Sequence, residues 1–210
     1  ICEIMNDDGS MSRLPELVAF AQQHGLKIGT IEDLIAYRLR NDRIVNEVSQ
    51  RVVSSRYGGE FAMHVYERDG VDVEHLALVK GDLSAPGPVL VRVHSVSFMA
   101  DALGIGPAAA GGETRIEIAM NAIAEEGRGV LVVIRDHRRN EVSETLSTTK
   151  DSAVRKAQAN EKRNVEIGIG SQILRDLGVT DMILLTNSPQ SVYVGLEAYG
   201  LKVVDQRLMK

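Results

Sequence analysis

Residues 92–113 read RVHSVSFMADALGIGPAAAGGE, and this stretch contains no cysteine. It continues an apolar run, PVLV, that is typical of a β-strand, and it precedes a segment with helical spacing. The chain holds a single cysteine, Cys2, which excludes an internal disulfide and any metal site built from several cysteines. The stretch therefore lacks the thiolate donors that zinc prefers.

The composition is that of an ordinary globular protein. The chain has 210 residues, of which 44% are hydrophobic and 25% charged, and its formal net charge is −5. This charge argues against general nucleic-acid binding, which needs a basic surface. A basic cluster from Lys150 to Arg163 has no interleaved aromatic residues, and it is typical of a solvated helix. No apolar run reaches membrane-spanning length and no signal peptide is visible, so we expect a cytoplasmic protein.

The first part of the chain has the pattern of helices followed by a polar connection. Apolar residues at helical spacing precede Gly25, which suits the position after a helix, and Thr30 can cap a second helix that carries Ile31, Leu34 and Ile35. The segment 39–56 is rich in polar residues and predicts a linker or an exposed helix. We expect domains at 1–38 and 57–210 on either side of it. The opening at Ile1 is typical of the interior of a longer polypeptide.

From residue 57 the pattern changes to strands and then to alternating strands and helices. FAMHVYER and VEHLALVKGD are separated by Asp69-Gly70, which predicts an antiparallel hairpin. Further strands are expected at PVLVRVHSVS, GVLVVIR, MILLT and LKVV, with helices at Glu113–Glu126, in IGSQILRDLGV, and between Pro189 and Gly200. The polar segment 143–164 has no wide apolar stripe and is expected to be mobile. The fold class is α+β, with an α/β-layered second half.

Two families are recognisable in order along the chain. The opening CEIMNDDG and the segment TIEDLIAYR resemble the carboxy-terminal end of 3,4-dihydroxy-2-butanone 4-phosphate synthase. From about Tyr57 onward the chain is similar to GTP cyclohydrolase II, in HLALVKGD, LVRVHS, IAEEGRGVL, GIGSQILRDLGV, LLTNSP and GLEAYGLKVV. The resemblance implies a bifunctional riboflavin-biosynthesis protein whose second part has the GTP cyclohydrolase II-like fold.

The resemblance also implies a zinc site in an active cyclohydrolase, where the metal activates the water that opens the imidazole ring of GTP. The three zinc-ligand positions of the family fall on Ser97, Ala108 and Ala110 in this sequence. The surrounding identities are kept at Arg92, Val93, His94, Ser95, Asp101 and Gly104. We therefore expect the scaffold of the site without its metal.

Further positions to which the family assigns chemistry are also changed. The guanine-contacting segment reads Asp136, His137, Arg138 and Arg139, of which only Arg139 is kept, and a catalytic tyrosine segment has no counterpart. Arg163 stands where the family has an acid/base aspartate, and Val165 stands where it has a nucleophilic arginine. Gln190 and Ser191 occupy the place of an expected lysine.

Three residues remain candidates for binding a nucleotide or phosphate: Arg92, Arg139 and Thr186. Arg92 matches a family arginine that contacts the triphosphate, and Thr186 matches a substrate-binding threonine. Alternatively, Arg92 forms an ion pair on an exposed strand and Thr186 caps a helix. Glu3 matches a synthase-site glutamate, but the rest of that site would lie upstream, so no catalytic residue is expected here. His137 lies in a charged run and is expected to be a solvated loop histidine.

The sequence thus favours a zinc-free, catalytically degenerate GTP cyclohydrolase II-like domain with a structural or regulatory role on the fused synthase. One alternative is an active GTP cyclohydrolase II that converts GTP to a ring-opened pyrimidine with release of pyrophosphate and formate. Another is a non-catalytic sensor of a nucleotide or a flavin precursor. We expect no cofactor in this chain, magnesium in the parent synthase, and zinc only if the cyclohydrolase is active. The expected partners are the synthase domain, a second copy of the chain and other riboflavin-pathway enzymes.

Overall fold

The structure is a computed structural model, and it describes residues 3–30, 34, 37–38, 42–105, 113–135, 141–146, 152–187 and 196–209. The chain divides into two compact units, residues 1–41 and residues 42–210. No helix within these described ranges is long and apolar enough to cross a membrane. The expected helix around Ile31 and Ile35 and the expected helix start at Pro189 lie outside the described residues.

The first unit includes a short helix, α1. α1 spans Leu14–Gln23, and the Glu16 carboxylate accepts a hydrogen bond of 2.8 Å from the backbone N–H of Arg13 at its start. Gly25 adopts a φ of +62° immediately after the helix, as its position in the sequence predicted. Ala21 is the one hydrophobic residue of this unit that is buried within the described part of the chain. The described residues of this unit therefore contribute little buried core.

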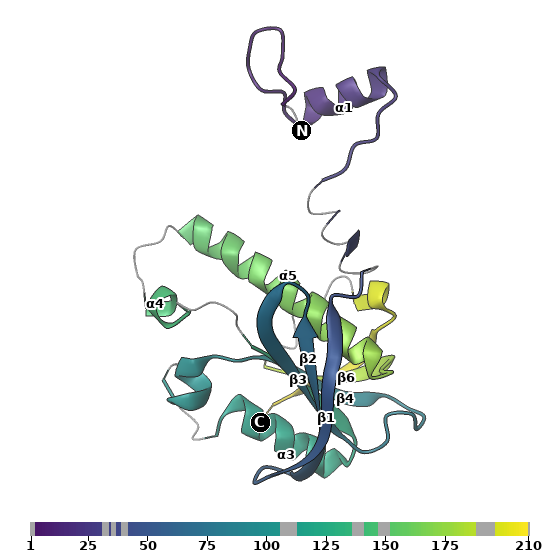
Figure 1. Ribbon diagram of the computed structural model, residues 1–210, viewed down its shortest axis with the longest axis vertical. Helices are drawn as coiled ribbons and strands as arrows, with labels where there is room; N and C mark the ends of the chain where they lie inside the picture. Colours follow the sequence, from purple (N-terminus) through teal and green to yellow (C-terminus); the bar gives the residue numbers. More distant parts are fainter. Residues whose placement is uncertain are drawn as a thin grey trace. The chain divides into compact units, whose positions relative to one another are not determined.

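The second unit is built on a mixed sheet (Figure 1). In the described part of the chain the strand order is β1-β2-β3-β5-β4-β6-β7. The strands are β1 Val45–Ser55, β2 Gly59–Arg68, β3 Val71–Lys80, β4 Val89–Ser95, β5 Gly129–Ile134, β6 Asp181–Thr186 and β7 Lys202–Leu208. β1, β2, β3 and β5 pair in antiparallel fashion, whereas β5, β4, β6 and β7 run parallel. The expected α+β class is confirmed, and so is the hairpin at Asp69-Gly70.

The helices of this unit pack on the sheet or connect its strands. Those in the described part of the chain are the π-helical turn η1 at Phe98–Ala102, α3 Arg115–Glu126, α4 Glu141–Leu146, α5 Ser152–Asp176 and the short 3₁₀ helix η3 Leu196–Tyr199. The N-cap hydroxyl of Thr114 accepts from Glu117 N, and Gly127 ends α3 with a φ of +74°. Such a cap and stop explain why this helix could be predicted from the sequence.

The core cluster of the sheet lies under α3. It comprises Phe61, Leu90, Ala119, Met120, Ile123, Leu131, Val133 and Leu185. β5 is buried along its whole length, as its continuous apolar run predicted. On β4 the side chains alternate, so that Leu90 joins this cluster while Val93 lies against Gly170 of α5. α3 and α5 therefore cover opposite faces of the sheet.

One expectation about local structure is wrong. Most of the expected linker 39–56 is β1, whose side chains from Asn46 to Val52 face solvent while its backbone pairs with β2 from Val45↔Arg68 to Ser55↔Gly59. The segment just before β1 is also anchored, because the Gln172 side chain of α5 accepts from Ile44 N and donates to Asp42 O. Residues 143–146 and 152–164 of the polar segment lie in α4 and in the first half of α5, and the expected mobility of this segment stays a prediction.

Candidate functional site

A crevice opens where β4 and β6 stop pairing. Their ladder runs from Val89↔Met182 to Val91↔Leu184, but β4 continues to Ser95 and β6 to Thr186. The chain leaves β4 through α3 to reach β5 on one side, and it then crosses through α5 to β6 on the other side. Such a reversal of strand order at the carboxyl ends of parallel strands is the usual place for a ligand in an open α/β sheet.

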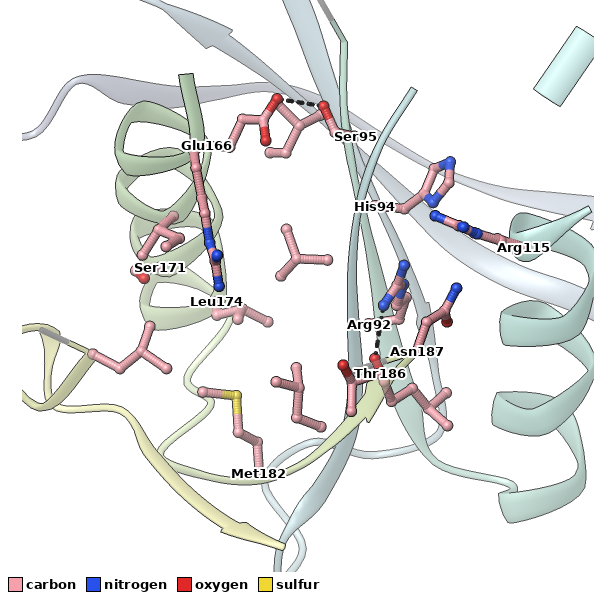
Figure 2. A pocket seen from close by; sticks show the side chains of 17 residues that line it. Arg92, His94, Ser95, Arg115, Glu166, Ser171, Leu174, Met182, Thr186 and Asn187 are labelled. Atoms are coloured by element: carbon pink, nitrogen blue, oxygen red, sulfur yellow. Dashed lines mark hydrogen bonds between the residues drawn. The ribbon is translucent and has the colours of Figure 1, made fainter. Parts of the chain in front are cut away.

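The crevice holds a cavity of about 470 Å³ between α3 and α5 (Figure 2). Its apolar lining includes Val93, Ile134, Ile167, Leu174, Met182, Leu184, Leu185 and Leu196. Its polar lining consists of Arg92, His94, Ser95, Arg115, Arg163, Glu166, Ser171, Thr186 and Asn187. An apolar cavity of this size with a few convergent polar groups has the general character of a small-molecule site.

Two of the three predicted binding residues meet in this cavity. Arg92 lies at the point where the two strands separate, and its Nη1 donates a hydrogen bond of 3.0 Å to the backbone oxygen of Leu185. Thr186, at the end of β6, is 2% exposed. Arg92 therefore does not extend from an exposed strand; it spans the crevice. The third candidate, Arg139, lies outside the described residues, as do His137 and the Gln190-Ser191 pair.

The start of the stretch that lacks cysteine is organised by a hydrogen-bond network. Asp101 Oδ2 accepts from His94 Nε2 at 2.8 Å and from the backbone N–H of Ser97 at 2.8 Å. The Ser97 hydroxyl accepts from Ala100 N at 3.4 Å and so caps η1. Burial lowers the pKa of His94 below its ordinary value, and the positive charges of Arg92 and Arg115 act in the same direction. The hydrogen bond and the charge of Asp101 partly oppose this shift.

These residues do not fit the zinc ion that the resemblance to cyclohydrolases implies. The hydroxyl of Ser97 is a cap for η1, and alanine at positions 108 and 110, which lie outside the described residues, has no donor atom. Within the described ranges no group of three or more His, Cys, Asp or Glu side chains is placed to hold a metal. A tetrahedral zinc site needs thiolate, imidazole or carboxylate donors that this set does not supply.

Several polar side chains of the cavity were not identified as site residues from the sequence. Arg115 comes from the first turn of α3, while Arg163 and Glu166 come from α5. The Ser95 hydroxyl donates a hydrogen bond of 2.5 Å to Glu166 Oε1. The spacing of three between Arg163 and Glu166 places them on one helix face, which is the signal that could have identified them. Glu3 belongs to the first unit and is exposed.

Comparisons with known proteins agree with this architecture. The family model of GTP cyclohydrolase II matches residues 45–208, and that of 3,4-dihydroxy-2-butanone 4-phosphate synthase matches residues 1–37. The riboflavin biosynthesis protein RibBA of Aquifex aeolicus is 40% identical over 98% of this chain and 52% of its own length. The monofunctional riboflavin biosynthesis protein RIBA 2 of Arabidopsis thaliana is 40% identical over 97% of this chain and 42% of its own length.

A solved structure shows the same fold. It is RibBX, a two-domain 3,4-dihydroxy-2-butanone 4-phosphate synthase from A. baumannii, with a TM-score of 0.66 and 33% identity over 99% of this chain and 52% of that chain. The chain thus spans about half the length of these relatives. The cyclohydrolase match covers the whole sheet together with α3 and α5, and the synthase match covers most of the first unit. The chain belongs to the GTP cyclohydrolase II family, with the end of a 3,4-dihydroxy-2-butanone 4-phosphate synthase domain before it.

Proposed function

We propose that this chain is part of a riboflavin-biosynthesis protein, and that its GTP cyclohydrolase II domain is catalytically degenerate and acts on the fused synthase as a structural or regulatory domain. The observation that carries the proposal is the donor set of the former metal site. Ser97 is committed to capping η1, and the two other family ligand positions are alanines. Water attack on the imidazole ring of GTP depends on a metal to lower the pKa of that water.

The groups that would support such chemistry are changed as well. Arg163 lines the cavity where the family resemblance calls for an acid/base aspartate, and Val165 stands at the place of the nucleophilic arginine. A guanidinium stays protonated and cannot exchange protons near neutral pH, and valine has no reactive atom. The sheet, the crevice and Arg92 are retained, so the fold persists without the catalytic groups.

The relatives support a role alongside a synthase. The A. baumannii relative is a two-domain synthase, and residues 1–37 of this chain match a synthase family. The Arabidopsis relative is named monofunctional, so likeness across these proteins does not require two activities. The proposed partners are the synthase part of the same polypeptide, with its magnesium, and a second copy of the chain in a homodimer. A cytoplasmic location belongs to the same proposal.

Metal analysis and a turnover assay test the proposal. The chain is purified from zinc-supplemented cells, its zinc content is measured by plasma mass spectrometry, and formation of the ring-opened pyrimidine from GTP is followed by absorbance. We expect no stoichiometric zinc and no product. One zinc per chain together with turnover of GTP would establish the alternative, an active GTP cyclohydrolase II.

A regulatory role is tested on the longer parent polypeptide. Synthase activity is compared between the intact parent and a parent that carries substitutions in the crevice, such as Arg92→Gln. A structural or regulatory domain predicts a changed synthase rate or a changed response to pathway metabolites. Identical kinetics for every crevice variant, in protein of unchanged stability, would argue against regulation through this site.

A further inference from the structure

The crevice between β4 and β6 keeps the features of a ligand site even though its donor set does not fit a metal. It lies at the carboxyl ends of parallel strands, and its volume of about 470 Å³ falls within the range of small-molecule pockets. The floor is apolar and includes Leu174, Met182, Leu184 and Leu185. A ligand that fills it must therefore present a carbon skeleton to these side chains.

One side of the cavity carries positive charge. Arg92 and Arg115 lie on the side of α3, together with His94 and Asn187 (Figure 2). The hydrogen bond from Arg92 to Leu185 O fixes the direction of its guanidinium. Burial lowers the pKa of His94, and the positive charges of the two arginines act in the same direction. Guanidinium groups held in this way bind phosphate oxygens in bidentate fashion.

The opposite side carries a carboxylate. Glu166 of α5 is held by the hydroxyl of Ser95 at the end of β4, and it is the one acidic side chain among the described residues that line the cavity. An ionised carboxylate only accepts hydrogen bonds, so it favours hydroxyl or amino groups of a ligand. Its negative charge opposes a second phosphate at this end of the cavity, and the guanidinium of Arg163, one turn earlier on α5, offsets part of that repulsion.

From this arrangement we propose that the crevice is a metal-free binding site for a phosphomonoester that carries hydroxyl or amino groups on its carbon skeleton. The phosphate binds at Arg92 and Arg115, the skeleton lies over the apolar floor, and the donor groups meet Glu166. This inference rests on the proposed function, since it treats the domain as one that binds without hydrolysing GTP. Binding of this ligand in the crevice would be the signal through which the domain regulates the fused synthase.

Calorimetry on protein treated with a chelator tests the proposal. The probe is ribose 5-phosphate, and ribose, inorganic phosphate and GTP with magnesium are the comparators. We expect ribose 5-phosphate to bind more tightly than any of the three. Because a hydrogen bond to a charged group contributes about 1.5–3 kcal/mol, Arg115→Gln is expected to weaken its binding by about tenfold or more. Arg207→Gln removes the same charge at a site on β7, where Arg207 pairs with Glu126, and is expected to leave binding unchanged.

The Glu166→Gln variant provides a second test of the proposal by the same calorimetric measurement. This variant is expected to weaken ribose 5-phosphate and to strengthen inorganic phosphate, because it removes the repulsion but also the stronger acceptor. Absence of ribose 5-phosphate binding, an equal loss in Arg115→Gln and Arg207→Gln, or tighter binding of GTP would overturn the inference. Thermal melting of each variant separates lost binding from lost folding. Failure of the proposed function would appear instead as zinc content and GTP turnover in the assay above.

Discussion

His94 Nε2 and Asp101 Oδ2 lie 2.8 Å apart, and their side chains are only 6% and 11% exposed. Since a carboxylate carries no proton to donate, Nε2 bears the hydrogen and Asp101 accepts it. The same carboxylate oxygen accepts from Ser97 N, so one residue ties the end of β4 to the start of η1. This contact gives the segment a fixed conformation by hydrogen bonding alone.

Replacement of Asp101 by alanine should destabilise the domain by about 1–3 kcal/mol, because it leaves two largely buried donors without their acceptor. The free energy of unfolding in urea measures the effect. Asp82→Ala is the matched control: Asp82 also accepts a backbone N–H, from Ser84 at 2.9 Å, but in an exposed loop. An equal loss of unfolding free energy in both variants would show that the Asp101 contact stabilises the domain no more than an exposed loop hydrogen bond does.

The pKa of His94 predicts how stability depends on pH. Burial lowers the pKa of the folded imidazole below its ordinary value, so the unfolded chain takes up a proton first as the pH falls. The contribution of His94 is therefore fully present above about pH 6.5 and is lost as the pH drops through the folded pKa. Urea midpoints at about pH 7.5 and pH 5.5 should show a smaller acid-induced loss in His94→Gln than in the unsubstituted protein. An equal loss would assign the acid sensitivity to other groups.

Gly58 and Gly59 provide a test of close packing between the β1–β2 turn and α3. Both have positive φ, +71° and +78°, so alanine at either position costs about 1 kcal/mol in backbone strain. At Gly58 a new Cβ would also lie 2.7 Å from Ala124 Cβ and 2.8 Å from Met120 O, whereas at Gly59 it meets nothing within 4 Å. We expect Gly58→Ala to lower the free energy of unfolding by about 2 kcal/mol more than Gly59→Ala does. Similar losses would mean that the turn moves away from α3.

Restoring the family's cysteines separates the metal from the rest of the chemistry. The triple variant Ser97→Cys, Ala108→Cys and Ala110→Cys supplies three thiolates, which suit zinc. We expect it to bind zinc after reconstitution but to leave GTP intact, because Arg163 and Val165 remain. Zinc content and pyrimidine formation are measured on the same samples. Turnover of GTP by this variant would show that the cysteines alone had been lost.

The strands could be predicted where burial shaped their sequence. β5 is buried throughout and reads GVLVVI, and this continuous apolar composition predicts a central strand. β1 has side chains that are exposed from Asn46 to Val52, and no apolar alternation marks it. Only its backbone pairing with β2 makes it a strand. This pairing depends on the three-dimensional fold and leaves no pattern in the local sequence. A polar edge strand and a polar linker therefore look alike in the sequence.

The residues of the cavity could likewise be predicted only where they adjoin buried apolar strands. Arg92 and Thr186 could be proposed because they lie next to apolar strand runs that the sequence shows clearly, and both line the crevice. Arg115 and Glu166 reach it only through the way α3 and α5 pack on opposite faces of the sheet. Nothing local to either helix specifies that packing.

The pairing of β4 with β6 has a consequence for biosynthesis. On the ribosome, β1, β2 and β3 can pair with one another soon after they emerge, because closing the short connections between them costs little conformational entropy. β6 emerges only after α3, β5 and α5, so the edge of β4 that pairs with β6 stays unpaired until β6 has been synthesised. The crevice is thus among the last parts of the domain to form, so a ligand of the proposed kind would bind only chains in which β6 has already paired with β4.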